Sequence, residues 1–280
     1  MSHPNKKIKE IKSINVNSYI YSLLLLFDGR FACGSSSFLI DIYTHDVTLE
    51  TSLKGHRDWV ISLCQLEDER LVSCSLDLSI RIWDVYTYSC LFKISSAHCE
   101  QINKVIVISE NFFASSSQDG TIKLWSSDEP YRNRPIKSIS WGYNNIISML
   151  YIEEDNYLLF ASCDSLCTWS LSANQMINSI LGVECCSYNS VYRVDKDRVI
   201  IGGKISVHVV DFKKGIIVDS FVDRELSSVH SFAGVTKSTI MYSDYKGQFW
   251  LYDVDTKQRE FMKSSHTSRV LDFLRFDIRS

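Results

Sequence analysis

The segments LVSCSLDLSIRIWD (residues 71–84) and FFASSSQDGTIKLW (residues 112–125) carry a serine, an aspartate and a tryptophan at the same spacing. In each segment the aspartate follows the serine by four residues, and the tryptophan follows the aspartate by six. The matching residues are Ser73, Asp77 and Trp83 in the first segment and Ser115, Asp119 and Trp125 in the second. The positions of the two tryptophans indicate a repeated unit of roughly 40 residues.

The same phase extends to both sides of these segments. Tyr43 precedes the first tryptophan by close to one such period, and Trp169 follows the second by close to one. Val210 and Tyr252 continue the series at similar intervals. Each of these residues lies in a segment where apolar residues alternate, which is typical of a half-buried strand. Six units are therefore in register.

Each unit also contains short apolar runs separated by turn residues. In the second unit these runs are WVISLCQL, RLVSCS, SIRIWDV and SCLFKI, between residues 59 and 94. A period of about 40 to 45 residues with four short strands per unit is the sequence signature of a β-propeller. The chain has only three prolines and no long helical period. The sequence therefore predicts an all-β fold, a propeller of six four-stranded blades plus a partial seventh built from the chain ends.

We expect a single propeller domain over residues 1–280. The expected blades span approximately residues 15–55, 56–97, 98–142, 143–184, 185–226 and 227–265, and residues 5–14 and 266–280 form the partial closing blade. His266 suits the start of a blade, but the aspartate expected at the same spacing as in the two complete units would fall beyond Ser280. Three explanations stay open: a shortened chain, a two-stranded seventh blade, or an open propeller that a partner protein completes by strand addition.

The composition excludes several classes of partner. The net charge is −3 and 45% of the residues are hydrophobic, so no charge excess points to nucleic acid or a membrane surface. The longest apolar run, residues 23–27, is far shorter than the roughly 20 residues of a membrane helix. Nine cysteines are scattered without a disulfide framework, and we expect them to be reduced. The expected location is the cytoplasm or the nucleus.

Gly55-His56 and Trp83-Asp84, with the serine and aspartate between them, resemble the signature of the WD-repeat family, and the phase covers nearly the whole chain. In that family a histidine, a serine, an aspartate and a tryptophan form a hydrogen-bonded network that holds each blade together. The resemblance implies this network for His56, Ser73, Asp77 and Trp83 and for His98, Ser115, Asp119 and Trp125. The spacing from the histidine to the aspartate is the same in both units.

The other four units lack the complete signature. Tyrosine or valine replaces the tryptophan in units one, five and six, and Trp169 in unit four follows Asp164 by only five residues. Tyrosine and valine still suit a half-buried strand. We therefore expect these blades to fold with fewer internal hydrogen bonds and to be the more mobile part of the ring.

The resemblance also implies where partners bind. In WD-repeat proteins the loops before the first strands and the turns between second and third strands form a face that commonly receives proteins or peptides. The corresponding positions here are Arg57, Asp58, Trp59, Leu76, Glu100, Gln101, Gln118, Tyr143 and Asn144. Trp59 is the strongest candidate because aromatic residues dominate interface hot spots. Packing within its own blade is the alternative role for this indole.

No catalytic, phosphate-binding or metal motif stands out in the sequence. Cys163, Cys167, Cys185 and Cys186 could be considered as zinc ligands, but their spacing is not that of paired C-x2-C motifs. We therefore expect a non-enzymatic scaffold or adaptor subunit of a multiprotein complex, with no cofactor, no metal and no specific nucleic-acid partner. The alternative is a substrate receptor of a ubiquitin ligase that works through a separate adaptor. The residues before the first blade are few for an F-box, and WDVYTY lacks the arginine of cullin-adaptor-binding propellers.

Overall fold

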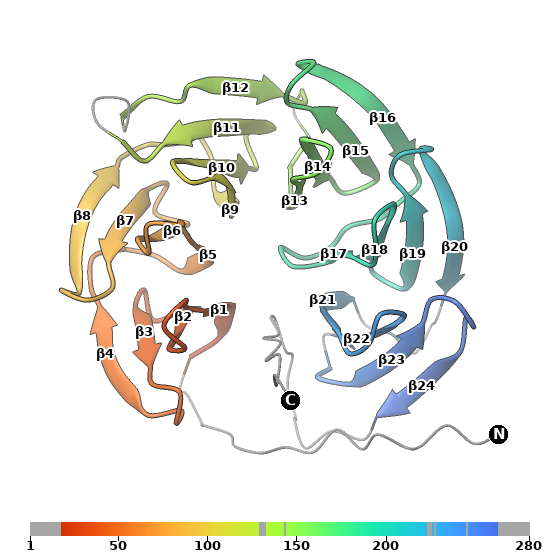
Figure 1. The fold of residues 1–280 in the computed structure, drawn as a ribbon, viewed down its shortest axis with the longest axis horizontal. Helices are drawn as coiled ribbons and strands as arrows, with labels where there is room; N and C mark the ends of the chain where they lie inside the picture. Colours follow the sequence, from red (N-terminus) through yellow and green to blue (C-terminus); the bar gives the residue numbers. More distant parts are fainter. Residues whose placement is uncertain are drawn as a thin grey trace.

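The computed structural model describes residues 18–128, 133–142, 144–222, 226, 228–244 and 246–262. Within these residues 24 β-strands form six separate four-stranded antiparallel sheets. The sheets stand around a common axis as the blades of a propeller (Figure 1). The predicted all-β propeller with six four-stranded blades is confirmed. In this described part of the chain, no helix is long and apolar enough to cross a membrane.

The blades are numbered here in chain order. The strands of blades one to three are β1 (Ile20–Leu25), β2 (Phe31–Ser35), β3 (Ile40–Tyr43), β4 (Leu49–Leu53), β5 (Val60–Gln65), β6 (Leu71–Ser75), β7 (Ile80–Asp84), β8 (Ser89–Ile94), β9 (Ile102–Ser109), β10 (Phe112–Ser117), β11 (Thr121–Ser126) and β12 (Lys137–Ser140). The strands of blades four to six are β13 (Ser148–Ile152), β14 (Tyr157–Ala161), β15 (Ser165–Ser170), β16 (Gln175–Leu181), β17 (Val191–Arg193), β18 (Arg198–Gly202), β19 (Ser206–Asp211), β20 (Ile216–Val222), β21 (Val229–Gly234), β22 (Thr239–Asp244), β23 (Phe249–Asp253) and β24 (Arg259–Met262).

Each blade is an antiparallel meander in which strands that are neighbours in the chain are neighbours in the sheet. The first strand of each blade lies nearest the axis, and the fourth lies at the rim (Figure 1). Each sheet falls inside one of the six residue ranges expected from the period. The expected closing segments, residues 5–14 and 266–280, lie outside the described residues.

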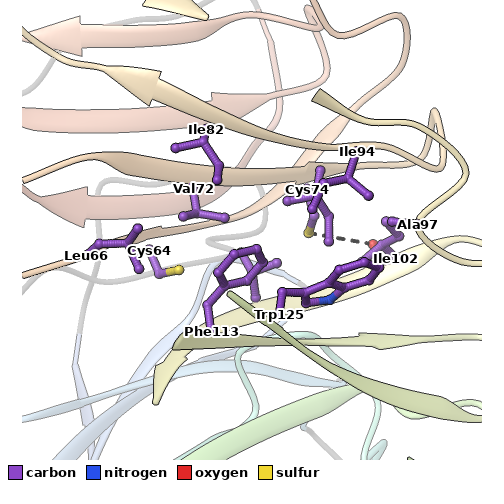
Figure 2. Packing of buried hydrophobic residues seen from close by; sticks show 12 residues of the cluster. Cys64, Leu66, Val72, Cys74, Ile82, Ile94, Ala97, Ile102, Phe113 and Trp125 are labelled. Atoms are coloured by element: carbon purple, nitrogen blue, oxygen red, sulfur yellow. Dashed lines mark hydrogen bonds between the residues drawn. The ribbon is translucent and has the colours of Figure 1, made fainter. Parts of the chain in front are cut away.

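Buried apolar side chains hold neighbouring blades together. Five cores join blade one to two, two to three, three to four, four to five and five to six. In the core between blades two and three, Phe113 and Trp125 pack against Val72 and Cys74 (Figure 2). Removing this apolar surface from water is the main stabilising term, at about 25 cal/mol per Å². Within the described residues, no core of this kind joins blade six to blade one.

The six residues that define the sequence period share one structural position on the third strands. They are Tyr43, Trp83, Trp125, Trp169, Val210 and Tyr252, and all except Trp169 are buried. In blades one, two, four and five a β-bulge shifts the pairing of the third and fourth strands at this residue. The units are therefore equivalent in backbone geometry even where the tryptophan has been replaced.

Arginines in the turns between first and second strands link neighbouring blades at one end of the strands. Arg30 of blade one donates to the Val85 carbonyl of blade two at 3.0 Å. Arg70 of blade two donates to the Ser127 carbonyl of blade three at 3.0 Å and to its hydroxyl at 2.9 Å. The separation of the two arginines in the chain is close to one blade repeat. These bonds fix the angle between blades, a role that the sequence analysis did not assign.

Candidate partner-binding face

The four network residues of blade two meet inside the blade. His56 Nδ1 lies 3.1 Å from Asp77 Oδ2, and His56 Nε2 lies 2.7 Å from Ser73 Oγ. The Trp83 indole N–H donates to the same Ser73 Oγ at 2.8 Å. Trp83 lies on β7 and Ser73 on β6, while His56 precedes β5. One chain of hydrogen bonds therefore ties the loop before the first strand to the second and third strands.

Blade three repeats this arrangement almost atom for atom. His98 Nδ1 lies 2.9 Å from Asp119 Oδ2, and His98 Nε2 lies 2.7 Å from Ser115 Oγ. The Trp125 indole N–H donates to Ser115 Oγ at 2.8 Å. The structure thus brings together both sets of residues that the sequence grouped.

The protonation states follow from burial and from the direction of these bonds. Burial lowers the pKa of His56, more than its hydrogen bond with Asp77 raises it, so the imidazole is neutral near pH 7. Its Nδ1–H then donates to Asp77, and its Nε2 accepts the Ser73 hydroxyl proton. Burial raises the pKa of Asp77, but hydrogen bonds from His56 and Ser79 outweigh it and hold that pKa well below its usual range. A neutral histidine and a charged carboxylate therefore share the site.

In blades two and three a further hydroxyl group completes the network, and the sequence analysis missed it. The Ser79 hydroxyl donates to Asp77 Oδ1 at 2.6 Å, and the Thr121 hydroxyl donates to Asp119 Oδ1 at the same distance. Ser75 accepts the Asp77 backbone N–H at 3.1 Å. The signal was present in SLDLS (residues 75–79) and SQDGT (residues 117–121), where hydroxyl residues flank the aspartate on both sides.

The aspartates position the loops in which the candidate partner-binding residues lie. Asp77 Oδ2 accepts the Arg57 backbone N–H at 3.0 Å. The Leu76 N–H donates to the Trp59 carbonyl at 3.0 Å, and the Gln118 N–H donates to the Gln101 carbonyl at 2.9 Å. We call the surface formed by residues 57–59, 76, 100, 101 and 118 the Trp59 face. Its backbone is held by the buried network and by the Asp58 carboxylate, which accepts the Trp59 backbone N–H at 2.8 Å.

Trp59 lies on this face with 39% of its surface exposed. Its ring stacks on the buried Tyr21 ring of blade one, with centroids 5.3 Å apart and planes inclined by 20°. Tyr21 also packs with Ile61, and Leu76 and Tyr188 cover that pair. An aromatic and aliphatic platform therefore joins blades one, two and five next to the exposed indole.

Tyr188 reaches this platform on a loop that crosses the ring. Residues 182–190 connect β16 to β17, and this connection is longer than the one that precedes β5. Asn189 donates from Nδ2 to the Tyr21 carbonyl at 3.2 Å and accepts a hydrogen bond from the Lys104 ammonium of blade three. Ser148 of blade four donates to the Tyr188 carbonyl at 2.8 Å. The sequence analysis missed this loop, whose only signal was its length.

The remaining candidates are distributed around the same face. Glu100 is exposed, and its carbonyl accepts the Ser117 hydroxyl at 3.1 Å. Asn144 is also exposed, and its backbone follows Gly142, whose carbonyl leaves no room for a Cβ at Gly120. Tyr143 lies outside the described residues. The exposed candidates are thus mostly polar, and the aromatic contribution comes from Trp59.

Two of the blades without the network, blades four and one, have aromatic contacts in this region. In blade four Phe160 meets Trp141 edge to face with centroids 5.6 Å apart. The Trp169 indole N–H of this blade has no hydrogen-bond partner in the described residues. In blade one Phe31 stacks on Tyr43 at 5.5 Å. Exchanging both partners of a buried hydrogen bond for apolar groups costs little, whereas blade four keeps the buried Trp169 N–H without a partner among the described residues.

The cysteines considered as zinc ligands do not converge on a metal position. In the part of the chain that the structure describes, no group of three or more histidine, cysteine or acidic side chains is placed to hold a metal ion. All nine cysteines are free thiols. Burial raises the pKa of Cys185 to about 12, which keeps this thiol protonated and a poor ligand.

Comparison with known proteins agrees with this geometry. The profile of the family "WD domain, G-beta repeat" matches residues 47–84 and 89–126. Each match begins in or just before the outer strand of one blade and ends in the third strand of the next. The two matches therefore contain the two complete networks.

Three relatives illustrate the similarity. The chain is 31% identical over 131 residues to WD repeat-containing protein 55 homolog of Drosophila willistoni, a match that spans 46% of this chain and 25% of the relative. It is 31% identical over 131 residues to F-box/WD repeat-containing protein sel-10 of Caenorhabditis elegans, spanning 45% of this chain and 22% of the relative. It is 27% identical over 168 residues to nuclear distribution protein nudF of Aspergillus niger, spanning 56% of this chain and 37% of the relative.

The matches cover between 22% and 37% of these longer proteins, and their names do not share one activity. What the structure and the comparisons have in common is the repeat itself, at the place where the hydrogen-bonded network is complete. The chain is therefore a six-bladed β-propeller that contains two repeats of the WD family, and these two repeats carry the full signature.

Proposed function

We propose that this protein is a non-enzymatic scaffold or adaptor subunit of a multiprotein complex, and that it binds partner proteins or peptides through the Trp59 face. WD-repeat propellers generally serve as protein-interaction scaffolds, and a rigid ring with binding residues on loops suits that work. We assign the protein to the cytoplasm or the nucleus, where nine free thiols remain reduced.

One observation carries the proposal: the Trp59 indole is not needed for the loop that presents it. Gln101 occupies the same position in blade three, and its carbonyl accepts the same turn hydrogen bond at nearly the same distance, 2.9 Å against 3.0 Å. A large aromatic side chain that the backbone does not require, partly exposed beside a firm platform, has the character of an interface anchor. Stacking on Tyr21 holds the ring in one orientation, which reduces the entropy lost on binding.

The test exchanges the indole for the residue that blade three uses. A Trp59→Gln variant keeps the loop geometry and should lose specific partners by about tenfold or more in quantitative affinity purification from native extract, because an interface anchor contributes at least about 1.4 kcal/mol. Leu91→Gln on β8, where the side chain is 46% exposed, serves as the matched control and should retain them. Equal recovery of all partners by Trp59→Gln and wild type would refute the assignment.

A second candidate function, substrate receptor of a ubiquitin ligase, is favoured by one observation, the match to an F-box/WD repeat-containing protein. In this candidate the same face would bind a substrate while a separate adaptor contacts the ligase. Co-purification of a ligase adaptor with the wild-type protein and with the Trp59→Gln variant would support it. Absence of any ligase component from the purified complex would exclude it.

We also propose that a closing element packs between blades six and one. The five cores of the described residues leave this junction without one of its own. The chain ends or a partner strand could supply the missing surface. A cooperative melt that is independent of concentration and of any partner would show that the chain closes its own ring.

A further inference from the structure

Strand β20 has an apolar edge that the other rim strands lack. It is the outermost strand of blade five and pairs on one side only, with β19. Four of its seven residues are exposed aliphatic side chains: Ile216 at 50%, Ile217 at 40%, Val218 at 43% and Val222 at 65%. In Figure 1 this strand lies on the rim, away from the axis. An exposed apolar strand edge is a template for pairing with another chain.

The other rim strands provide an internal comparison. Strands β4, β8 and β24 each expose one large apolar side chain, namely Leu49, Leu91 and Phe261. Strand β16 exposes two, Ile177 and Leu181, and β12 exposes none. The concentration of aliphatic surface on β20 is therefore a property of this strand and not of rim strands in general.

Natural edge strands usually carry an outward charged side chain that prevents pairing with another chain, and β20 has no outward charge. Its only charged residue is Asp219. This carboxylate accepts a hydrogen bond from the Tyr252 hydroxyl of blade six and lies 3.3 Å from the Lys257 ammonium. Both contacts draw the charge toward blade six and away from the free edge.

We propose that β20 is a self-association edge, at which two copies of this chain meet antiparallel about a two-fold axis. A strand that is aliphatic and has no outward charge is complementary to itself in that arrangement, so one surface serves both copies. The exposed aliphatic patch measures on the order of 300 Å² per copy, comparable to the largest apolar patch of a typical monomer, which is often functional. Two such patches bury on the order of 600 Å² together, below the roughly 1,000 Å² at the lower end of specific interfaces. The dimer is therefore weak and depends on concentration.

Sedimentation velocity of the full chain over a concentration series tests this proposal. The wild type should shift from monomer to dimer as its concentration rises. Val222→Lys places a charge on the edge and should weaken the dimer by about tenfold or more, since burying an unpaired ammonium is strongly unfavourable. Leu91→Lys adds the same charge to the rim of blade two and should leave the dimer unchanged.

Folding is checked by thermal melting of each variant, which should match the wild type because Val222 is 65% exposed and Leu91 is 46% exposed, so that neither side chain belongs to a core. A wild-type protein that stays monomeric up to the solubility limit would overturn the proposal. A dimer that persists unchanged in folded Val222→Lys would also overturn it, because the contact would then lie elsewhere, for example at the junction of blades six and one.

Discussion

Two adjacent serines on β10 allow the contribution of the hydrogen-bonded network to stability to be measured apart from the contribution of burial. Ser115 and Ser116 are both fully buried. Ser115 Oγ accepts the Trp125 indole N–H at 2.8 Å and donates to His98 at 2.7 Å. Ser116 Oγ has no hydrogen-bond partner among the described residues. Replacing each by alanine removes the same single oxygen from the same strand.

The expected losses in free energy of unfolding differ because only Ser115→Ala leaves other polar groups without hydrogen-bond partners. Ser115→Ala leaves the Trp125 N–H and one His98 nitrogen buried without partners, at about 1 to 3 kcal/mol each, so we expect a total loss of about 2 to 6 kcal/mol. Ser116→Ala removes an unsatisfied hydroxyl and should change stability by less than about 0.5 kcal/mol or increase it. Urea unfolding followed by far-ultraviolet circular dichroism, with equal m values, measures both. Equal losses in the two variants would refute the role given to the network.

The remaining predictions concern pH, local stability and the contacts between blades. Burial lowers the pKa of His56 and His98 from 6.5, so below that pH the unfolded state binds more protons than the folded state. The urea concentration at the unfolding midpoint should therefore decrease as the pH is lowered from about 7 to about 5. A midpoint that increases as the pH is lowered would contradict the assignment of neutral histidines. Hydrogen exchange should be slower at the amides around Trp83 than around Val210, because blade five lacks the network, and equal protection would count against that expectation. Arg70→Ala should lower the free energy of unfolding by about 1 to 2 kcal/mol through lost bonds to blade three, with Arg70→Lys recovering only part of it in the same urea assay; full recovery by lysine would show that charge alone matters.

Much of this fold was predictable because its units repeat. The tryptophan spacing gave the phase, and alternation of apolar residues gave the strands, so six blade ranges could be assigned before any contact was known. The two networks were implied by the resemblance to WD repeats, and the equal spacing of His56 to Asp77 and of His98 to Asp119 agrees with it. Their geometry is set locally, within a single blade, which is why a match to the family signature was sufficient.

The features that sequence reasoning missed depend on contacts between distant blades. Tyr188 meets Tyr21 across the ring although the two are far apart in the chain. Arg70 reaches a carbonyl of the next blade, and a carbonyl carries no sequence signal. Phe160 stands at the serine position of blade four, four residues before Asp164, but its contact with Trp141 could not be inferred because Trp141 belongs to no signature position. Periodicity describes one unit, whereas these contacts are made between units.

Hydrogen–deuterium exchange of the protein bound to a purified partner tests the central claim most directly. If the Trp59 face is the binding surface, the complex should show added protection in peptides containing residues 57–59, 76, 100, 101 and 118 and in the loop of residues 182–190. Peptides from the turns between first and second strands, at residues 66–70 and 153–156, should exchange as they do in the free protein. Protection confined to those turns or to the rim strands, with the Trp59 face unchanged, would contradict the account.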